Sequence, residues 1–150
     1  MKVLFLDCDG VLNTRPGSLD EDKLAMLAGI VNETACDVVV SSSWRTVPHM
    51  LKRLSEALLD RQVVIHGVTP ELSSTPLPWG FSMERPRHEE ITAWLLKHPE
   101  VESYCILDDM SYADDGSGRF VQTNAHEGLT DKAAQTVIGT LLQPLVPTNA

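Results

Sequence analysis

The sequence predicts an α/β protein in which a mostly parallel sheet of about five strands is covered by helices on both faces. Short apolar runs alternate along the chain with segments of helical periodicity, the order typical of parallel sheets. A chain of 150 residues is long enough to bury one hydrophobic core without disulfides. Because no internal repeat or linker interrupts it, we expect residues 1–150 to form a single domain, a Rossmann-like three-layer sandwich.

The first half of the chain is expected to alternate strand and helix. A continuous apolar run at Lys2–Leu6 predicts a strand that is buried on both faces. Residues 19–34 carry apolar side chains at helical spacing behind an acidic first turn, which predicts a helix. The β-branched run within residues 36–43, the proline-opened segment Pro48–Leu59 and the run 62–68 predict a strand, a helix and a strand.

The second half continues this alternation after a break. Residues 69–86 contain four of the nine prolines and show no periodicity, so we expect an irregular loop there. Residues 87–98 then predict a helix, and residues 104–109 predict a strand that ends in two acids, as the first strand does. Residues 119–123 are expected to form an edge strand, and residues 130–143 a closing helix.

The composition excludes broad classes of partner. A net charge of −9 leaves no extended basic surface for gripping long nucleic acid through its phosphates. We expect no membrane-spanning segment, because no run of about 18 apolar residues is present, and no export, because the N-terminus lacks the apolar region of a secretory signal. The widely spaced Cys8, Cys36 and Cys105 match no metal-binding pattern and indicate reduced thiols in a cytoplasmic protein.

Acidic and hydroxyl residues follow several of the expected strands. They are Asp7, Asp9, Ser41, Ser42, Asp108 and Asp109, each of which comes just after an apolar run. The carboxyl ends of parallel strands meet at one edge of the sheet, and ligands bind there near the point where the strand order reverses. Acids gathered at one edge repel each other, so we expect a cation to bind among them.

The residue types at this edge indicate magnesium and phosphate chemistry. Carboxylate oxygens without neighbouring His or Cys ligands suit Mg²⁺, which shares its coordination with a substrate phosphate. A carboxylate beside such an ion can also attack phosphorus. Asp7 and Asp9 are spaced so that one attacks while the other, displaced by the turn at Gly10, exchanges a proton with the leaving group. Both could instead be turn formers, but the second acidic pair, Asp108 and Asp109, favours a functional site.

Three motifs of the sequence resemble those of one superfamily. "DCDGVLN" resembles the nucleophile motif of the haloacid dehalogenase (HAD) phosphotransferases, "VVVSSSWR" their Ser/Thr motif and "CILDD" their acidic metal motif. With "ITAWL" and "NAHEGLT", the set is similar to the compact HAD domain that occurs alone or attached to RNA repair proteins. The resemblance spans about residues 2–141, and it implies a HAD-type phosphatase.

The resemblance implies a role for each motif residue. Asp7 is the nucleophile and Asp9 the general acid and base. The ligands of Mg²⁺ are Asp7, Asp9 through its backbone carbonyl, Asp108 and, in support, Asp109. Ser41 hydrogen-bonds a phosphoryl oxygen, with Ser42 as the second choice. Ser43 is expected to lead into the next helix or to cap it.

The chain departs from the family pattern at one catalytic position. The family places a lysine at the start of the helix before the last acidic motif, where this sequence reads "ERPRHEE". We assign that role to Arg87, with Arg85 in reserve, because a guanidinium also clamps phosphate; a solvated surface arginine is the alternative. Trp44 and Arg45 are candidates to stack on a base and bind a phosphate, although a Trp after a strand more often packs in the core.

Too few residues remain between the motifs for a separate cap domain, so the site is expected to be open. In this superfamily an open site accompanies large substrates, and the expected partner is a phosphorylated substrate such as an oligonucleotide end. Five arginines are expected near the site: Arg15, Arg45, Arg85, Arg87 and Arg119. The sequence predicts no particular oligomeric state.

Three other functions compete with a phosphatase. A receiver-like signalling domain also uses Asp and Mg²⁺ but carries its phosphate acceptor after the third strand, and here the third apolar run ends in no acid. A Mg²⁺-dependent nuclease would use the same carboxylates without a covalent intermediate. An inactive interaction module is disfavoured because the lysine is the one motif residue that is missing.

Overall fold

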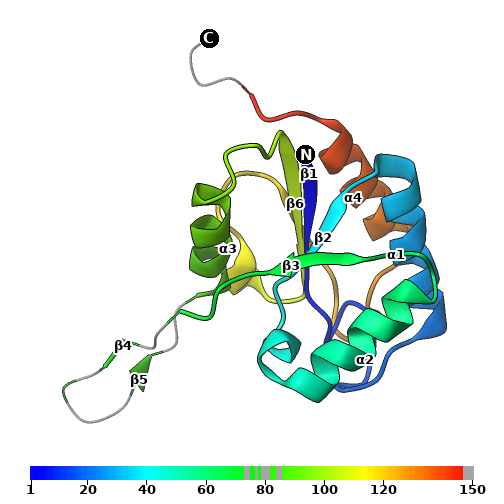
Figure 1. Ribbon diagram of the computed structural model, residues 1–150, viewed down its shortest axis with the longest axis horizontal. Helices are drawn as coiled ribbons and strands as arrows, with labels where there is room; N and C mark the ends of the chain where they lie inside the picture. Colours follow the sequence, from blue (N-terminus) through cyan, green and yellow to red (C-terminus); the bar gives the residue numbers. More distant parts are fainter. Residues whose placement is uncertain (73–74, 77, 79–81, 84–85, 147–150) are drawn as a thin grey trace.

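A five-stranded, all-parallel sheet runs through the middle of the molecule in the computed structural model, which describes residues 1–72, 75, 76, 78, 82, 83 and 86–146 (Figure 1). Its strands are β1 (Lys2–Leu6), β2 (Asp37–Val40), β3 (Ile65–Val68), β6 (Ser103–Asp108) and β7 (Phe120–Gln122). The α-helices are α1 (Glu21–Thr34), α2 (Pro48–Leu59), α3 (Arg87–Leu96) and α4 (Asp131–Leu142), and the short 3-10 helices are η1 (Ser43–Thr46) and η2 (Ser111–Ala113).

Helices cover both faces of the sheet, so the prediction of a three-layer α/β fold is confirmed (Figure 1). Side chains alternate between the two faces along β1. Leu4 and Leu6 pack in the larger core, to which α1, α2 and α4 contribute, whereas Val3 and Phe5 pack in the smaller core against α3. A strand buried on both faces explains why the sequence of β1 is continuously apolar.

The order of the strands places a crevice between β1 and β6. The order is β3-β2-β1-β6-β7: β2 and β3 are added on one side of β1, and β6 and β7 then follow on its other side. Ligands of doubly wound sheets bind at such a reversal, beyond the carboxyl ends of the strands. Asp7 follows β1 and Asp108 ends β6, and both therefore lie at this point.

The structure differs from the expected elements in two places. The third strand begins at Ile65 instead of residue 62, because Gln62 has a left-handed backbone (φ 64°) and the Val63 N–H donates to the Leu58 carbonyl at 2.9 Å. The expected loop 69–86 contains a separate antiparallel pair, β4 (Thr75–Pro76) and β5 (Ser82–Met83). Strands of two residues are too short to leave a periodic pattern in the sequence.

Two further expectations concern the edge strand and membrane-spanning segments. β7 lies at one edge of the sheet, as predicted. Among the residues that the structure describes, no helix is both long enough and apolar enough to cross a bilayer.

Candidate active site

Three carboxylates converge at the crevice between β1 and β6. Asp7 leaves β1 with its N–H donating to the Leu107 carbonyl at 3.1 Å, and Asp108 accepts a hydrogen bond from the Met110 N–H at 2.9 Å. One oxygen of each of Asp7, Asp108 and Asp109 lies within 4.8 Å of the others, and we call this group the carboxylate cluster. Asp7 and Asp108 are buried, whereas Asp109 is half-buried.

Gly10 permits the close approach of Asp109. The backbone of Gly10 is left-handed, with φ of 82°, and a Cβ at this position would lie 2.4 Å from Asp109 Oδ2. The Gly10 carbonyl accepts a hydrogen bond from Thr123 Oγ1 at 2.7 Å, which ties the turn to the segment after β7. A larger residue here would displace both the turn and one member of the cluster.

Arg87, the first residue of α3, faces the cluster. Its Nη1 lies 3.1 Å from Asp7 Oδ1 and 2.7 Å from Asp108 Oδ2. The Tyr112 ring lies on the guanidinium, 5.1 Å from Cζ to centroid. Burial by itself lowers the pKa of Arg87, but Asp108 and Asp7 raise it above its ordinary value, so the side chain stays charged.

Ionisation of all three acids of the cluster would leave more negative charge than Arg87 neutralises. Burial and then the neighbouring Asp108 raise the pKa of Asp7 to about 9, although Arg87 opposes this shift. Burial likewise raises the pKa of Asp108. Three oxygen donors with excess negative charge fit a hard divalent cation, which would take the charge that Arg87 leaves uncompensated.

We expect Mg²⁺ to raise the melting temperature more at about pH 8 than at about pH 5. Between 3.8 and about 9, folded Asp7 without metal retains a proton that the unfolded chain releases, so stability falls as pH rises across this window. A cation that binds the folded cluster displaces the Asp7 proton and so offsets this loss, and the displacement costs less at pH 8 than at pH 5. Calorimetry at both pH values, with Asp7→Asn as the control that flattens the response, checks this; equal shifts at both pH values contradict it.

Asp9 turns away from the cluster into hydrogen bonds of its own. Oδ1 accepts from Asn13 Nδ2 and from the Gly17 N–H, both at 2.9 Å, and Oδ2 accepts from Trp44 Nε1 at 3.1 Å. Burial alone raises the pKa of Asp9, but these three bonds and the nearby charge of Arg53 hold it below the ordinary value. Asp9 is therefore a carboxylate in this structure. The expected metal ligand is its backbone carbonyl, and that stays a prediction.

The two serines after β2 differ in their partners. Ser41 is held at the sheet edge by its N–H, which donates to the Leu6 carbonyl at 2.8 Å. Its hydroxyl is buried and, among the described residues, lacks a hydrogen-bond partner. Ser42 Oγ accepts from the Trp44 N–H at 3.1 Å and caps η1, so Ser43 is the first residue of η1 and not its cap. Ser41 is the serine with a donor to offer a ligand.

Arg45 lies at the expected edge but is engaged by the protein. Its Nε donates to the Thr69 carbonyl at 2.9 Å and its Nη1 to the Ser42 carbonyl at 2.8 Å. Its Nη2 forms a buried ion pair with Glu90 Oε2 at 2.8 Å. A substrate contact for Arg45 stays a prediction, and a phosphate would have to compete with these contacts.

The other three arginines that were expected near the site are Arg119, Arg15 and Arg85. The expectation that Arg119 lies near the site is wrong. Arg119 precedes β7 and binds the Thr140 and Gln143 carbonyls at the amino ends of the strands, whereas the site lies at their carboxyl ends. Arg15 is exposed on the loop that follows Asp9. Arg85 lies outside the described residues.

Sequence reasoning missed two contacts at the site. Trp44 is 1% exposed, so a base cannot stack on it as the chain stands, and its indole instead binds Asp9. Arg53 lies with its guanidinium 5.0 Å from the Trp44 ring. The Trp in "SSSWR" was a usable signal for the first contact, whereas Arg53 stands in an ordinary polar face of α2.

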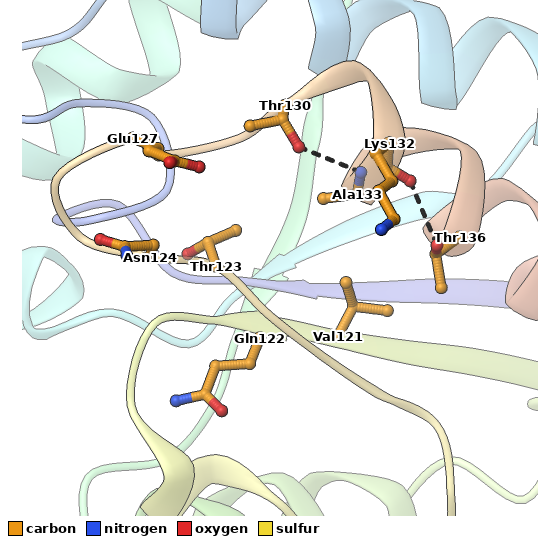
Figure 2. Close-up of a pocket in the computed structure, with 10 residues that line it drawn as sticks. Val121, Gln122, Thr123, Asn124, Glu127, Thr130, Lys132, Ala133 and Thr136 are labelled. Carbon is orange, nitrogen blue, oxygen red and sulfur yellow. Dashed lines mark hydrogen bonds between the residues drawn. The ribbon is translucent and has the colours of Figure 1, made fainter.

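A cavity of about 300 Å³ adjoins the site between β7 and α4 (Figure 2). Lys132 and Thr136 of α4 lie across it from Val121 (Figure 2). Two of its lining residues also support the carboxylate cluster, since the Thr123 N–H donates to the Asp108 carbonyl and Gln122 Nε2 donates to the Asp109 carbonyl, both at 3.0 Å. The cavity is a neighbour of the cluster and does not include it.

Comparison with known families agrees with this geometry. The family model described as "HAD domain in Swiss Army Knife RNA repair proteins" matches residues 3–134, which include all of β1 but its first residue, β6 and the whole carboxylate cluster. No curated protein matches the chain at a significant level. Because the family model spans most of the 150 residues and the expected crevice holds the acidic cluster, the protein belongs to the HAD superfamily as a capless domain.

Proposed function

We propose that the protein is a Mg²⁺-dependent phosphomonoester hydrolase that works through an aspartyl-phosphate on Asp7. One observation carries the proposal: Asp7 lies at the reversal of the strand order, faces Arg87 and shares the carboxylate cluster with Asp108 and Asp109. Membership of the HAD superfamily supports hydrolase activity of the phosphatase kind. In this proposal residues 1–150 act as one catalytic domain.

The reaction consists of two displacements at phosphorus. An Asp7 oxygen attacks, and a bond forms from it to phosphorus while the bond to the leaving oxygen breaks. Asp9 is a carboxylate in the free site, so in this proposal it takes up a proton from solvent when the substrate binds, and it gives that proton to the leaving oxygen. Water then attacks the same phosphorus, Asp9 takes a proton from the water, and Asp7 is released together with inorganic phosphate. We assign Arg87 and the unpartnered Ser41 hydroxyl to the phosphoryl oxygens.

The residues assigned to Mg²⁺ are Asp7, Asp108, Asp109 and the backbone carbonyl of Asp9. The bound ion supplies positive charge against the phosphoryl oxygens. The carboxylate of Asp9 is not assigned to the metal, because Asn13 and Trp44 hold it outside the cluster.

We expect Asp9→Asn to lower kcat/KM by about 100-fold or more for alkyl phosphates and by less for p-nitrophenyl phosphate. The amide keeps the size of the side chain but gives no acidic proton, and a good leaving group needs less help. Steady-state rates on both substrate classes measure the difference. Equal losses on both would count against proton donation by Asp9.

We further propose that the substrate is the terminal phosphate of an oligonucleotide. The matched family model is described for RNA repair proteins, and a capless domain leaves room for a large substrate. A net charge of −9 favours recognition of a short end over a long tract. Few phosphates are neutralised in this mode, so the log-log dependence of affinity on salt should be shallow, about −1 to −3.

The test is a comparison of kcat/KM across substrate classes with Mg²⁺ present. We expect 5′- or 3′-phosphorylated RNA or DNA to exceed mononucleotides, sugar phosphates and phosphopeptides. If the kcat/KM of a free nucleotide or sugar phosphate is higher by about tenfold, equivalent to about 1.4 kcal/mol in the transition state, the proposed substrate is wrong but the phosphatase assignment stands.

We also propose that the protein acts in the cytoplasm. Cys8, Cys36 and Cys105 are buried free thiols, which supports action in a reducing compartment.

A further inference from the structure

We propose that Arg53 recognises a second negative charge on the leaving-group side of the scissile phosphate, and so selects oligonucleotide ends over substrates that carry one phosphate. The inference rests on the proposed function and deepens it, because it names the residue that distinguishes the substrate class. Arg53 lies on α2 and is exposed.

Two neighbours connect Arg53 to Asp9 by independent routes. Its guanidinium lies 5.0 Å from the Trp44 ring centroid, and the Trp44 indole donates to Asp9 Oδ2 at 3.1 Å. Its Nη2 donates to the carbonyl of Gly17, whose own N–H donates to Asp9 Oδ1 at 2.9 Å. Arg53 is thus one residue removed from both oxygens of the proposed acid.

This position corresponds to the leaving group and not to the phosphoryl group. Asp9 must lie beside the leaving oxygen to exchange its proton, so the rest of the leaving group continues past Asp9, where Arg53 is exposed. Arg87, by contrast, is buried against the carboxylates on the phosphoryl side. In an oligonucleotide, the next charge after the terminal phosphate is an internucleotide phosphodiester on this leaving-group side.

The guanidinium is prepared to bind such a charge. The Trp44 ring and the Gly17 carbonyl fix its orientation, which lowers the entropy lost when an anion binds. Within the described part of the chain, Nε and Nη1 of Arg53 have no hydrogen-bond partner, so donors remain for phosphate oxygens. A residue that served only to clamp the loop at Gly17 would affect all substrates alike.

The experiment compares two phosphorylated dinucleotides that differ by one charge: one has a normal phosphodiester and the other a neutral methylphosphonate linkage. Each is made with the terminal phosphate at the 5′ end and at the 3′ end. We expect the wild type to favour the charged dinucleotide of the preferred end by about 10- to 100-fold in kcat/KM, and added salt to reduce the ratio. In Arg53→Gln, which keeps a donor for Gly17 but loses the charge, the ratio should approach one.

Two further variants complete the test. Arg53→Lys keeps the charge without the planar fork and should retain part of the preference. Lys52→Gln makes the same charge change one residue away, at a side chain whose ion-pair partner is Glu56, and should keep the full ratio. A ratio that is unchanged in Arg53→Gln, or a wild type that hydrolyses both dinucleotides equally, overturns the role of Arg53 alone. No turnover of any substrate, p-nitrophenyl phosphate included, overturns the proposed function and this inference with it.

Discussion

Asp7→Asn is expected to lose phosphatase turnover by about 1,000-fold or more while the protein stays folded. The amide has nearly the shape of the carboxylate but cannot attack phosphorus, and it also lacks one charged ligand for the metal. Near neutral pH, Asp7 of the metal-free folded protein holds a proton that the unfolded chain releases, which costs stability, and an amide has no such proton; the change should therefore raise the melting temperature of the metal-free protein. Turnover of p-nitrophenyl phosphate and calorimetry on the same sample measure both effects.

The control and the trapped intermediate make this prediction specific. Asp60→Asn, the same chemical change at an exposed position at the end of α2, should keep full activity. Acid quenching of the wild type during turnover should yield an acyl phosphate on Asp7, detectable by mass spectrometry. Retention of a tenth of the activity in Asp7→Asn would refute covalent catalysis there, and cleavage of an internal phosphodiester without a phosphorylated protein would identify a nuclease.

Removal of divalent metal is expected to abolish turnover, and Ca²⁺ is expected to bind without restoring it. Among the residues that the structure describes, Arg87 is the cation paired with the carboxylate cluster, so a phosphate dianion is repelled when no metal ion is bound. Ca²⁺ takes more oxygen ligands than Mg²⁺ and competes for the Asp7 oxygen that attack requires. Rates after dialysis against EDTA, and after addition of each metal, measure the effect.

Binding of Ca²⁺ is checked separately, by the melting temperature. Ca²⁺ should stabilise the fold as Mg²⁺ does, because both satisfy the same carboxylates. Full activity in EDTA, with the absence of metal verified by elemental analysis, would refute the metal assignment.

The acids of the site were predictable because their positions follow from topology. Each apolar run that ends in an acid marks the carboxyl end of a strand, and parallel strands bring these ends to one edge whatever the loops do. Asp7 and Asp108 needed no more than this rule. Arg87 needed the family resemblance in addition, because the resemblance places a basic residue at the start of the helix that precedes β6.

Residues whose role depends on contacts distant in sequence were not predictable. Arg45 follows a strand end and looks like a phosphate ligand until Glu90 and the Thr69 carbonyl are placed against it. Arg119 is a different case. It precedes β7, so the rule on strand ends, applied to it, places it at the amino ends of the strands, where it binds the Thr140 carbonyl. Arg53 lies on a polar helix face where nothing in the sequence distinguishes it from Lys52.

The ion pair between Arg45 and Glu90 has a consequence for how this protein would look in a mutational scan scored by activity. Glu90 stands one turn after Arg87 on α3, so the buried pair anchors the helix that presents the proposed phosphate clamp. Loss of Arg45 would leave Glu90 as an unpaired buried charge and shift that turn. Arg45 would then score like a member of the catalytic set, although its partners are a carboxylate and backbone carbonyls of its own chain.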